Sequence, residues 1–192
     1  MNSFEGIIRE CEPQDTAAIT RIYAHHVLHG SATFEIEPPD DEEMERRRRA
    51  TIEQGFPYLV AEMGGEVVGY SYAGPYRPRR AYRHTVENSV YIRPDSIRQG
   101  IGRMLVSAII AECERRGFRQ MVAVIGDSAN HASIRLHEGL GFDFVGILRS
   151  VGFKFGRWVD SVLMQRELGA GDREPPGPST VPYGFHGNRP QS

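Results

Sequence analysis

The chain has 192 residues, of which 40% are hydrophobic and 25% charged, and its formal net charge is −2. This length fits one domain with one sizeable core, and the composition excludes collagen-like, coiled-coil and wholly disordered chains. No apolar run approaches the roughly 18–20 residues of a membrane helix, no secretory leader is recognisable, and two cysteines are too few for a disulfide framework. The near-neutral charge argues against a dedicated nucleic-acid binder. We therefore expect a cytoplasmic domain with neither a membrane nor a nucleic-acid partner.

The first part of the chain is expected to contain a strand and two helices. The strand is predicted over 6–9, and Pro13 opens a helix in which apolar residues recur at helical spacing, namely Ile19, Ile22, Tyr23 and Val27. A second helix begins near Asp40, and its four-arginine run at 46–49 follows a run of acidic residues. Because opposite charges four residues apart pair on a helix, this run predicts a solvated, ion-paired face.

The remaining elements alternate strands and helices. In chain order they are three strands, a helix, a strand, a helix and two strands, over 58–63, 67–76, 85–92, 100–116, 120–125, 130–140, 142–151 and 158–166. This order predicts a single α/β (α+β) domain with a mixed, mostly antiparallel sheet flanked by helices. It lacks the repeated units of a doubly wound nucleotide-binding domain. We place the domain at 1–168 and expect the Pro- and Gly-rich residues 169–192 to form a flexible tail.

The turn between the third predicted strand and the next helix has the composition of an anion site. Its residues are Arg98, Gln99, Gly100, Ile101, Gly102 and Arg103. Glycines let a ligand approach the backbone, the first helical turn has free N–H groups, and two arginines add positive charge. A P-loop needs Lys and Ser or Thr after its last glycine, and a dinucleotide fingerprint needs Gly or Ala at 105, so neither fits. The alternative is a glycine-capped helix start without a ligand.

This turn resembles the pyrophosphate loop of the GNAT superfamily of acetyl-CoA-dependent N-acetyltransferases. One residue departs from the family pattern, because Ile97 stands where relatives carry Gln or Arg three residues before the first glycine. Backbone amides bind most of the phosphate, so we expect the site to survive this change. The resemblance implies that the turn holds the pyrophosphate of acetyl-CoA, and that the backbone of Val90, Tyr91 and Ile92 holds its pantetheine arm.

A second stretch, 130–142, resembles a later motif of the same superfamily. The resemblance implies that Asn130 bonds the pantetheine arm. It also places His137 where many relatives carry a tyrosine that protonates the departing CoA thiolate, and a ring with an ordinary pKa near 6.5 can donate a proton near neutrality. The alternative for His137 is an ordinary half-buried histidine on a helix.

An arginine-rich loop precedes the strand at 85–92. Four arginines lie within 77–83 without acidic neighbours in sequence, which suits an anionic substrate group and suits a polycationic one poorly. The alternatives are a solvated loop or one that contacts only the phosphates of CoA.

Strand alternation divides the residues of 85–92 between two faces. Thr85, Glu87, Ser89 and Tyr91 share one face, unless a bulge like that of GNAT relatives intervenes. Acyl transfer needs a base for the protonated amine, and Glu87 is the candidate. An ordinary Glu is a weak base, so desolvation or an ordered water would have to assist. The alternative is an exposed Glu87 paired with Arg83.

Four segments, 31–38, 72–76, 85–91 and 151–160, resemble the phosphinothricin and methionine sulfoximine acetyltransferase branch, and the resemblance covers about 6–168. The motifs specific to that branch lie in the last two segments. In this branch the α-amine of a glutamate-like compound is acetylated, often across a homodimer cleft. The resemblance implies that Glu87 is the base, and that the substrate contacts are Phe34, Arg77, Arg83 and Thr85.

We expect direct transfer in a ternary complex, because no Cys lies in the strand at 85–92 to form an acyl-enzyme. No metal is expected, since His25, His26 and His29 lack a further ligand nearby in sequence. Two other functions remain open: acetylation of peptide or protein N-termini, and an acyl-CoA-sensing module without turnover.

Overall fold

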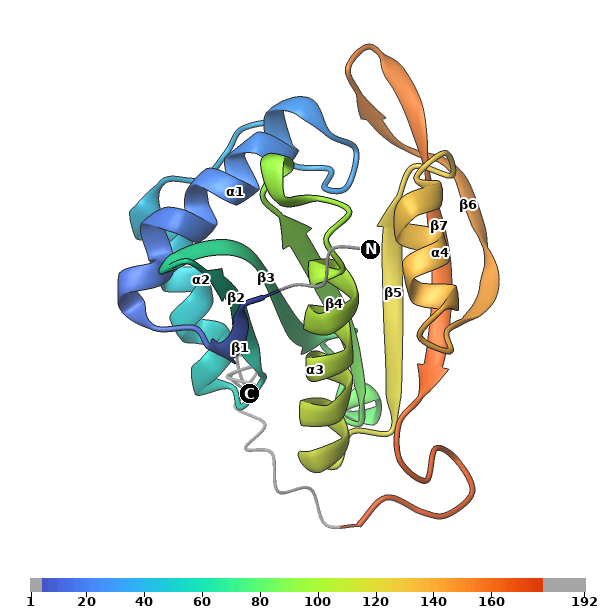
Figure 1. The fold of residues 1–192 in the computed structure, drawn as a ribbon. Helices are drawn as coiled ribbons and strands as arrows, with labels where there is room; N and C mark the ends of the chain where they lie inside the picture. The colour runs from blue at the N-terminus through green and yellow to red at the C-terminus, as the bar shows by residue number, and fades with distance from the viewer. Residues whose placement is uncertain (1–4, 178–192) are drawn as a thin grey trace, which may run out of the picture.

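One seven-stranded sheet organises the chain, seen in Figure 1, and the computed structural model describes residues 5–177. The strand order is β1-β2-β3-β4-β5-β7-β6, and every neighbouring pair is antiparallel except β4 and β5. The strands are β1 (Ile7–Glu10), β2 (Tyr58–Met63), β3 (Glu66–Pro75), β4 (Thr85–Ile92), β5 (Gln120–Gly126), β6 (Asp143–Lys154) and β7 (Arg157–Glu167). The predicted fold class and element order are confirmed.

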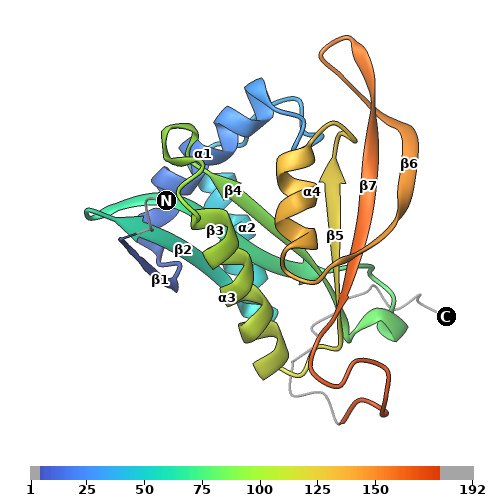
Figure 2. The same cartoon turned by 45° about the vertical axis from the view of Figure 1, so that its right-hand side comes forward.

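Helices cover both faces of this sheet, as Figure 2 shows. On one face lie α1 (Thr16–His29) and α2 (Asp41–Glu53), and on the other lie α3 (Ile101–Arg115) and α4 (His131–Glu138). Each layer has its own core. The apolar residues predicted for the first helix are buried, and they form the side of α1 that packs against the sheet. On the opposite face, Leu105 and Ile109 of α3 fill the other core.

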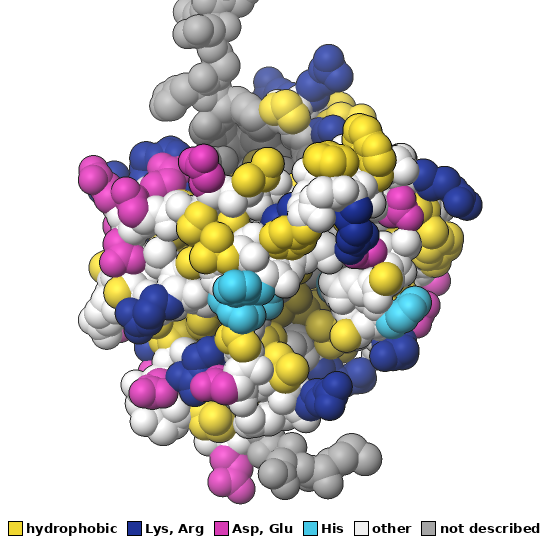
Figure 3. Space-filling model, turned by 90° about the horizontal axis from the view of Figure 1, so that it is seen from above, with side chains coloured by type: hydrophobic (Ala, Val, Ile, Leu, Met, Phe, Trp, Pro, Cys, Tyr) yellow, Lys and Arg dark blue, Asp and Glu magenta, His cyan; other side chains and the backbone are white. Residues whose placement is uncertain are grey.

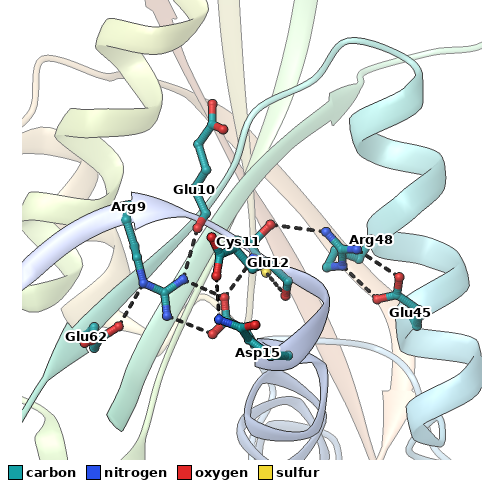
Figure 4. Close-up of polar contacts among 9 residues, drawn as sticks. Arg9, Glu10, Cys11, Glu12, Asp15, Glu45, Arg48 and Glu62 are labelled. Carbon is teal, nitrogen blue, oxygen red and sulfur yellow. Dashed lines mark hydrogen bonds and ion pairs between the residues drawn. The ribbon is translucent and has the colours of Figure 1, made fainter. Parts of the chain in front are cut away.

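Ion pairs tie the α1–α2 layer to the first strand, and Figure 4 shows their arrangement. Arg9 of β1 bonds Asp15, just before α1, and Glu62 of β2. The buried Arg48 of α2 bonds Glu45 and the backbone carbonyl of Cys11. The predicted ion pairing of the arginine run is confirmed, because Arg46 and Arg47 also pair with Glu43. The predicted solvation was wrong for Arg48, which is buried.

The pairing between β4 and β5 stops half-way along the strands. It runs from Thr85↔Gln120 to Asn88↔Ala123, while β4 stays paired with β3 as far as Ile92 and β5 stays paired with β7 as far as Gly126. The two strands therefore diverge, and the β5-facing backbone of residues 89–92 has no strand partner. The cleft described below lies at this divergence.

The strand β4 pairs with β3 without a bulge, so the alternation inferred from the sequence is confirmed. The β3–β4 register is unbroken from Gly69↔Ile92 to Pro75↔Val86. It is the divergence from β5 that leaves backbone groups of β4 without a strand partner. Strict alternation then places Glu87 and Asn88 on opposite faces of the sheet.

The chain beyond Leu168 is described only in part. Within 169–177, Arg119 forms an ion pair with Glu174 and donates to the carbonyl of Pro175. Residues 178–192 of the predicted tail lie outside the described residues. Between residues 5 and 177, no helix has the length and apolar character needed to cross a membrane.

Candidate active site

A cleft opens where β4 and β5 diverge, on the face covered by α3 and α4. Its inner part is a cavity of about 50 Å³, whose lining includes Asn88, Val90 and His137. Its outer part is a cavity of about 510 Å³ that extends to the N-terminus of α3. The two parts share lining residues, among them Val90 and Asn130. Figure 3, a view onto this end of the molecule, shows a hollow with hydrophobic side chains inside it and Lys or Arg side chains around it.

The glycine turn forms one end of the outer cavity. Gly100 caps α3 in the left-handed conformation at φ 82°, and Arg98 adopts a similar φ of 64°. No side chain caps this helix, so the N–H groups of its first turn remain available to an anion. Neither Arg98 nor Arg103 forms an ion pair with the described part of the chain, and both line the cavity. The predicted anion site therefore has the geometry of one, with the side chain of Ile97 in its lining.

Asn130 stands where the inner and outer parts meet. Its side-chain oxygen caps α4 by accepting from the Ser133 N–H at 3.2 Å. This cap fixes the start of α4 beside the end of β5. The predicted contact of Asn130 with a pantetheine arm stays a prediction, and its position is compatible with both roles.

His137 of α4 is buried, with 2% of its surface exposed. Its Nδ1 lies 2.8 Å from the backbone oxygen of Ser133, and its Nε2 lies 3.1 Å from the Nδ2 of Asn88. Burial lowers the pKa of the ring, while the Ser133 contact opposes that shift. The predicted role as proton donor needs an N–H directed at the departing sulfur. Both ring nitrogens already have protein partners, so the geometry does not favour that role.

Glu87 lies on the other face of β4 and is half-buried. Burial raises the pKa of its carboxyl group above the ordinary 4.5, and the positive charge of Arg77 partly opposes this. The alternative pairing with Arg83 is absent: within residues 5–177 no ion pair involves Glu87. Desolvation makes the Glu87 carboxylate a stronger base than an ordinary Glu. Desolvation was one of the two conditions under which Glu87 was expected from the sequence to act as a base.

The arginine loop approaches the same face from the end of β3. Its Arg77 guanidinium lies 5.2 Å from the centre of the Tyr76 ring, and a short 3-10 helix at Arg80–Tyr82 follows. The four arginines at 77–83 make no ion pair in the part of the chain that the structure describes. After burial, which is the main cause of each shift, the charge of Arg77 lowers the pKa of Glu87, and the charge of Arg83 lowers the pKa of His84.

The loop between α1 and α2 carries Phe34 to the end of β5. There the Phe34 ring packs against Gly126 and against Gly152 of β6, and a Cβ at either glycine would meet it. Lys154 of β6 fixes this loop, because its buried ammonium group donates to the backbone oxygens of Gly30 at 2.9 Å and Thr33 at 2.8 Å. Ala32 of this same loop lines both cavities, so the loop that Lys154 fixes forms part of the cleft wall.

A family model for the acetyltransferase (GNAT) domain matches residues 8–163. The chain belongs to the GNAT acetyltransferase family. A crystal structure of a GNAT superfamily phosphinothricin acetyltransferase from Sinorhizobium meliloti, in complex with AcCoA, superposes with a TM-score of 0.89 at 42% identity, covering 94% of this chain and 98% of that one.

Two curated GNAT relatives are similar over nearly the whole domain. The chain is 56% identical over 165 residues to a phosphinothricin N-acetyltransferase of Alcaligenes faecalis, covering 86% of this chain and 84% of the relative. It is 44% identical over 161 residues to an L-methionine sulfoximine/L-methionine sulfone acetyltransferase of Salmonella typhimurium, covering 84% and 94%. The resemblance identified from the sequence is thus confirmed at the level of family and branch.

Acetyl-CoA, the acyl donor of GNAT enzymes, fits the cleft of this chain. The donor set is chemically suitable, because a helix N-terminus and two unpaired arginines match a pyrophosphate, and a narrow passage between diverging strands matches an extended arm. Among the predicted contacts, Val90 and Ile92 line the outer cavity. Tyr91 turns its side chain into the core under α1, although it too lines the inner cavity. Gln99 does not line either cavity.

Sequence reasoning missed three residues at the site. Asn88 was placed on a face but given no role, Lys154 was part of a recognised segment, and Gly126 ends a buried strand. A lysine within an apolar hairpin was an available signal, because a charge in such surroundings needs a partner. The partnership of Asn88 with α4 depends on tertiary packing and has no local signature.

Proposed function

We propose that this chain transfers the acetyl group of acetyl-CoA to the α-amine of a small anionic amino acid, such as phosphinothricin, methionine sulfoximine or methionine sulfone. The observation that carries the proposal is Glu87, a half-buried carboxylate with raised pKa near an arginine loop, without an ion-pair partner among residues 5–177, on the face of β4 opposite the cleft. The names of the two curated relatives support the same substrates.

In this proposal Glu87 accepts the proton of the substrate amine, directly or through a water. Transfer occurs in a ternary complex, because neither cysteine is suited to form an acyl-enzyme. Cys11 and Cys113 are both buried away from the cleft, and burial raises the pKa of each thiol to about 12. A thiol that remains protonated and buried is a poor nucleophile.

The anionic end of the substrate is assigned to the arginine loop. Arg77 is the best-supported contact because its charge already acts on Glu87. Thr85 lies two residues before Glu87 on the same face, and the Phe34 ring packs against Gly126 at the end of β5. Arg83 completes the predicted set, with its contact expected to depend on substrate binding.

A homodimer is part of the proposal. The hairpin of β6 and β7 exposes large apolar side chains, and β6 is an edge strand of the sheet. They are Phe144, Val145, Ile147, Leu148, Val151, Phe153, Phe155 and Trp158. A long apolar edge exposed to water is a hazard unless a partner covers it. A second copy is the proposed partner, and sedimentation of Trp158→Asp as a monomer, where the wild type sediments as a dimer, would support it.

Action in the cytoplasm and a role in resistance also belong to the proposal. N-acetylation replaces a charged amine by a neutral amide, so an inhibitor that is read as an amino acid loses the group by which it is recognised. Cells that express the chain are therefore expected to survive phosphinothricin concentrations that stop growth of cells expressing Glu87→Gln.

The test is release of CoA thiol from acetyl-CoA with a panel of acceptors. The panel contains phosphinothricin, methionine sulfoximine, methionine sulfone, an aminoglycoside, spermidine and a short peptide. Release with the first three alone is the expected result. Release only with the peptide would favour the N-terminal acetyltransferase, and CoA binding without any release would favour the sensing module.

A further inference from the structure

Asn88 directly follows the proposed base but faces the opposite side of the sheet. Only 5% of its surface is exposed, and it lines the inner cavity of the cleft together with His137. The Nδ2 of Asn88 lies 3.1 Å from the Nε2 of His137. The side chain therefore joins β4 to α4 at the narrowest part of the cleft.

The hydrogen bonds around His137 determine its tautomer. The Ser133 backbone oxygen, 2.8 Å from Nδ1, can only accept, so Nδ1 carries the hydrogen. In the neutral ring Nε2 is then an acceptor, and the Asn88 amide donates to it. The ring also packs edge-on against Phe142, with 4.9 Å between the ring centres. His137 is thus fixed in position by contacts on several sides.

This arrangement leaves half of the Asn88 carboxamide unused. Its Nδ2 carries two N–H groups, and within residues 5–177 the only hydrogen-bond partner of this nitrogen is the histidine, which occupies one of them. The second N–H can therefore donate to an acceptor atom of a ligand in the cavity that Asn88 lines. The inner cavity, about 50 Å³ in volume, has room for a group as small as a thioester.

We propose that the Asn88 carboxamide binds the sulfur end of acetyl-CoA, and that His137 is a positioning residue that holds this carboxamide and donates no proton. The inference rests on the proposed function and deepens it. When the amine nitrogen forms its bond to the acyl carbon, the C–S bond breaks and its electron pair leaves on sulfur. The free N–H of Asn88 donates to that sulfur. Glu87 takes one proton from the substrate ammonium group, which makes the attacking amine, and the second proton leaves the nitrogen to water as the amide forms. The thiolate is protonated by water after release.

The first test measures binding without catalysis. Isothermal titration calorimetry compares CoA with desulfo-CoA, which lacks only the sulfur, on wild type and on Asn88→Ala. We expect wild type to bind CoA about fivefold more tightly, as one hydrogen bond allows, and Asn88→Ala to bind both equally. Asn88→Ser is the second variant if the alanine variant does not fold, and it is expected to reduce the preference. Retention of the full preference in a folded variant would overturn the inference.

The second test separates positioning from proton donation. His137→Gln supplies an acceptor for the Asn88 amide but no titrating ring, whereas His137→Leu supplies neither. We expect kcat of His137→Gln within about threefold of wild type and kcat of His137→Leu at least tenfold lower. Equal losses in both folded variants would show that the ring donates a proton. The exposed His131→Gln on the same helix is the matched control and is expected to leave kcat unchanged.

A spectroscopic measurement on the wild type needs no activity. The ¹⁵N shifts of the His137 ring at neutral pH are expected to report a neutral ring with hydrogen on Nδ1, and hydrogen on Nε2 would overturn the inference. These measurements also distinguish a failure of the proposed function from a failure of the inference about Asn88 and His137. An enzyme that acetylates no amino acid but shows the sulfur preference and this tautomer contradicts the proposed function and retains the inference.

Discussion

The two faces of β4 present different groups to the proposed reaction: Glu87 on one face and Asn88 on the other. On the α1–α2 face, the Glu87 carboxylate has no hydrogen-bonded partner among residues 5–177, and burial raises the pKa of its carboxyl group. On the α3–α4 face, its neighbour Asn88 is bonded to a buried histidine and lines the inner cavity. Strand alternation thus places the proposed base and the proposed contact for the leaving group one residue apart but on separate faces of the sheet. The proposed base, Glu87, must gain and lose a proton, and within residues 5–177 it forms no ion pair. The Asn88 carboxamide must keep its orientation, and its hydrogen bond to His137 holds it in place.

Replacement of Glu87 by Gln tests the first face with the largest expected effect. The introduced amide keeps the shape of the side chain but cannot accept the proton, so kcat is expected to fall by about 10²–10³-fold. Binding of CoA, which depends on the opposite face, is expected to change by less than about twofold. Steady-state kinetics and calorimetry on the same preparation check both values. Unchanged turnover would remove Glu87 from the role of base.

Replacement of Arg77 has the next largest expected effect. Arg77→Gln is expected to raise KM for phosphinothricin about 10–50-fold, the size of a lost charge-assisted hydrogen bond. It also removes a positive charge that lowers the pKa of Glu87. That pKa then rises further, so the acid limb of the kcat/KM profile is expected to move to higher pH.

Arg77→Lys is the matched control for this change. It keeps the charge and so is expected to leave the acid limb near its wild-type position, while KM still rises because a lysine binds an anion without the bidentate geometry of arginine. A variant Arg77→Gln whose acid limb does not move would contradict the coupling between the loop and the base.

Lys154 has the smallest expected effect because it acts through the α1–α2 loop. Lys154→Met leaves the backbone oxygens of Gly30 and Thr33 without their donor, which is expected to lower the free energy of unfolding by about 1–3 kcal/mol. KM for the acceptor is expected to rise about fivefold, since Phe34 loses its fixed position. Thermal denaturation and acceptor kinetics check these effects. Lys154→Arg, which still donates, should recover part of both, and no recovery would contradict the loop-positioning role.

The sequence was informative where chemistry depends on local pattern. The glycine turn and its arginines, the order of the elements and the face of Glu87 all follow from spacing, and the structure has them in the predicted form. Whether a bulge would interrupt β4, and where β4 and β5 diverge, could not be decided from the sequence because both depend on the pairing of the whole sheet. The surroundings of His137 were equally inaccessible, since they depend on how α4 packs against β4.

The central claim is that acceptor and acetyl-CoA occupy the two sides of β4 at the same time. Initial-rate kinetics with both substrates varied test it most directly. Intersecting double-reciprocal lines for phosphinothricin and acetyl-CoA, with CoA competitive against acetyl-CoA, are the result that this account predicts. Parallel lines would show an acyl-enzyme and would contradict it.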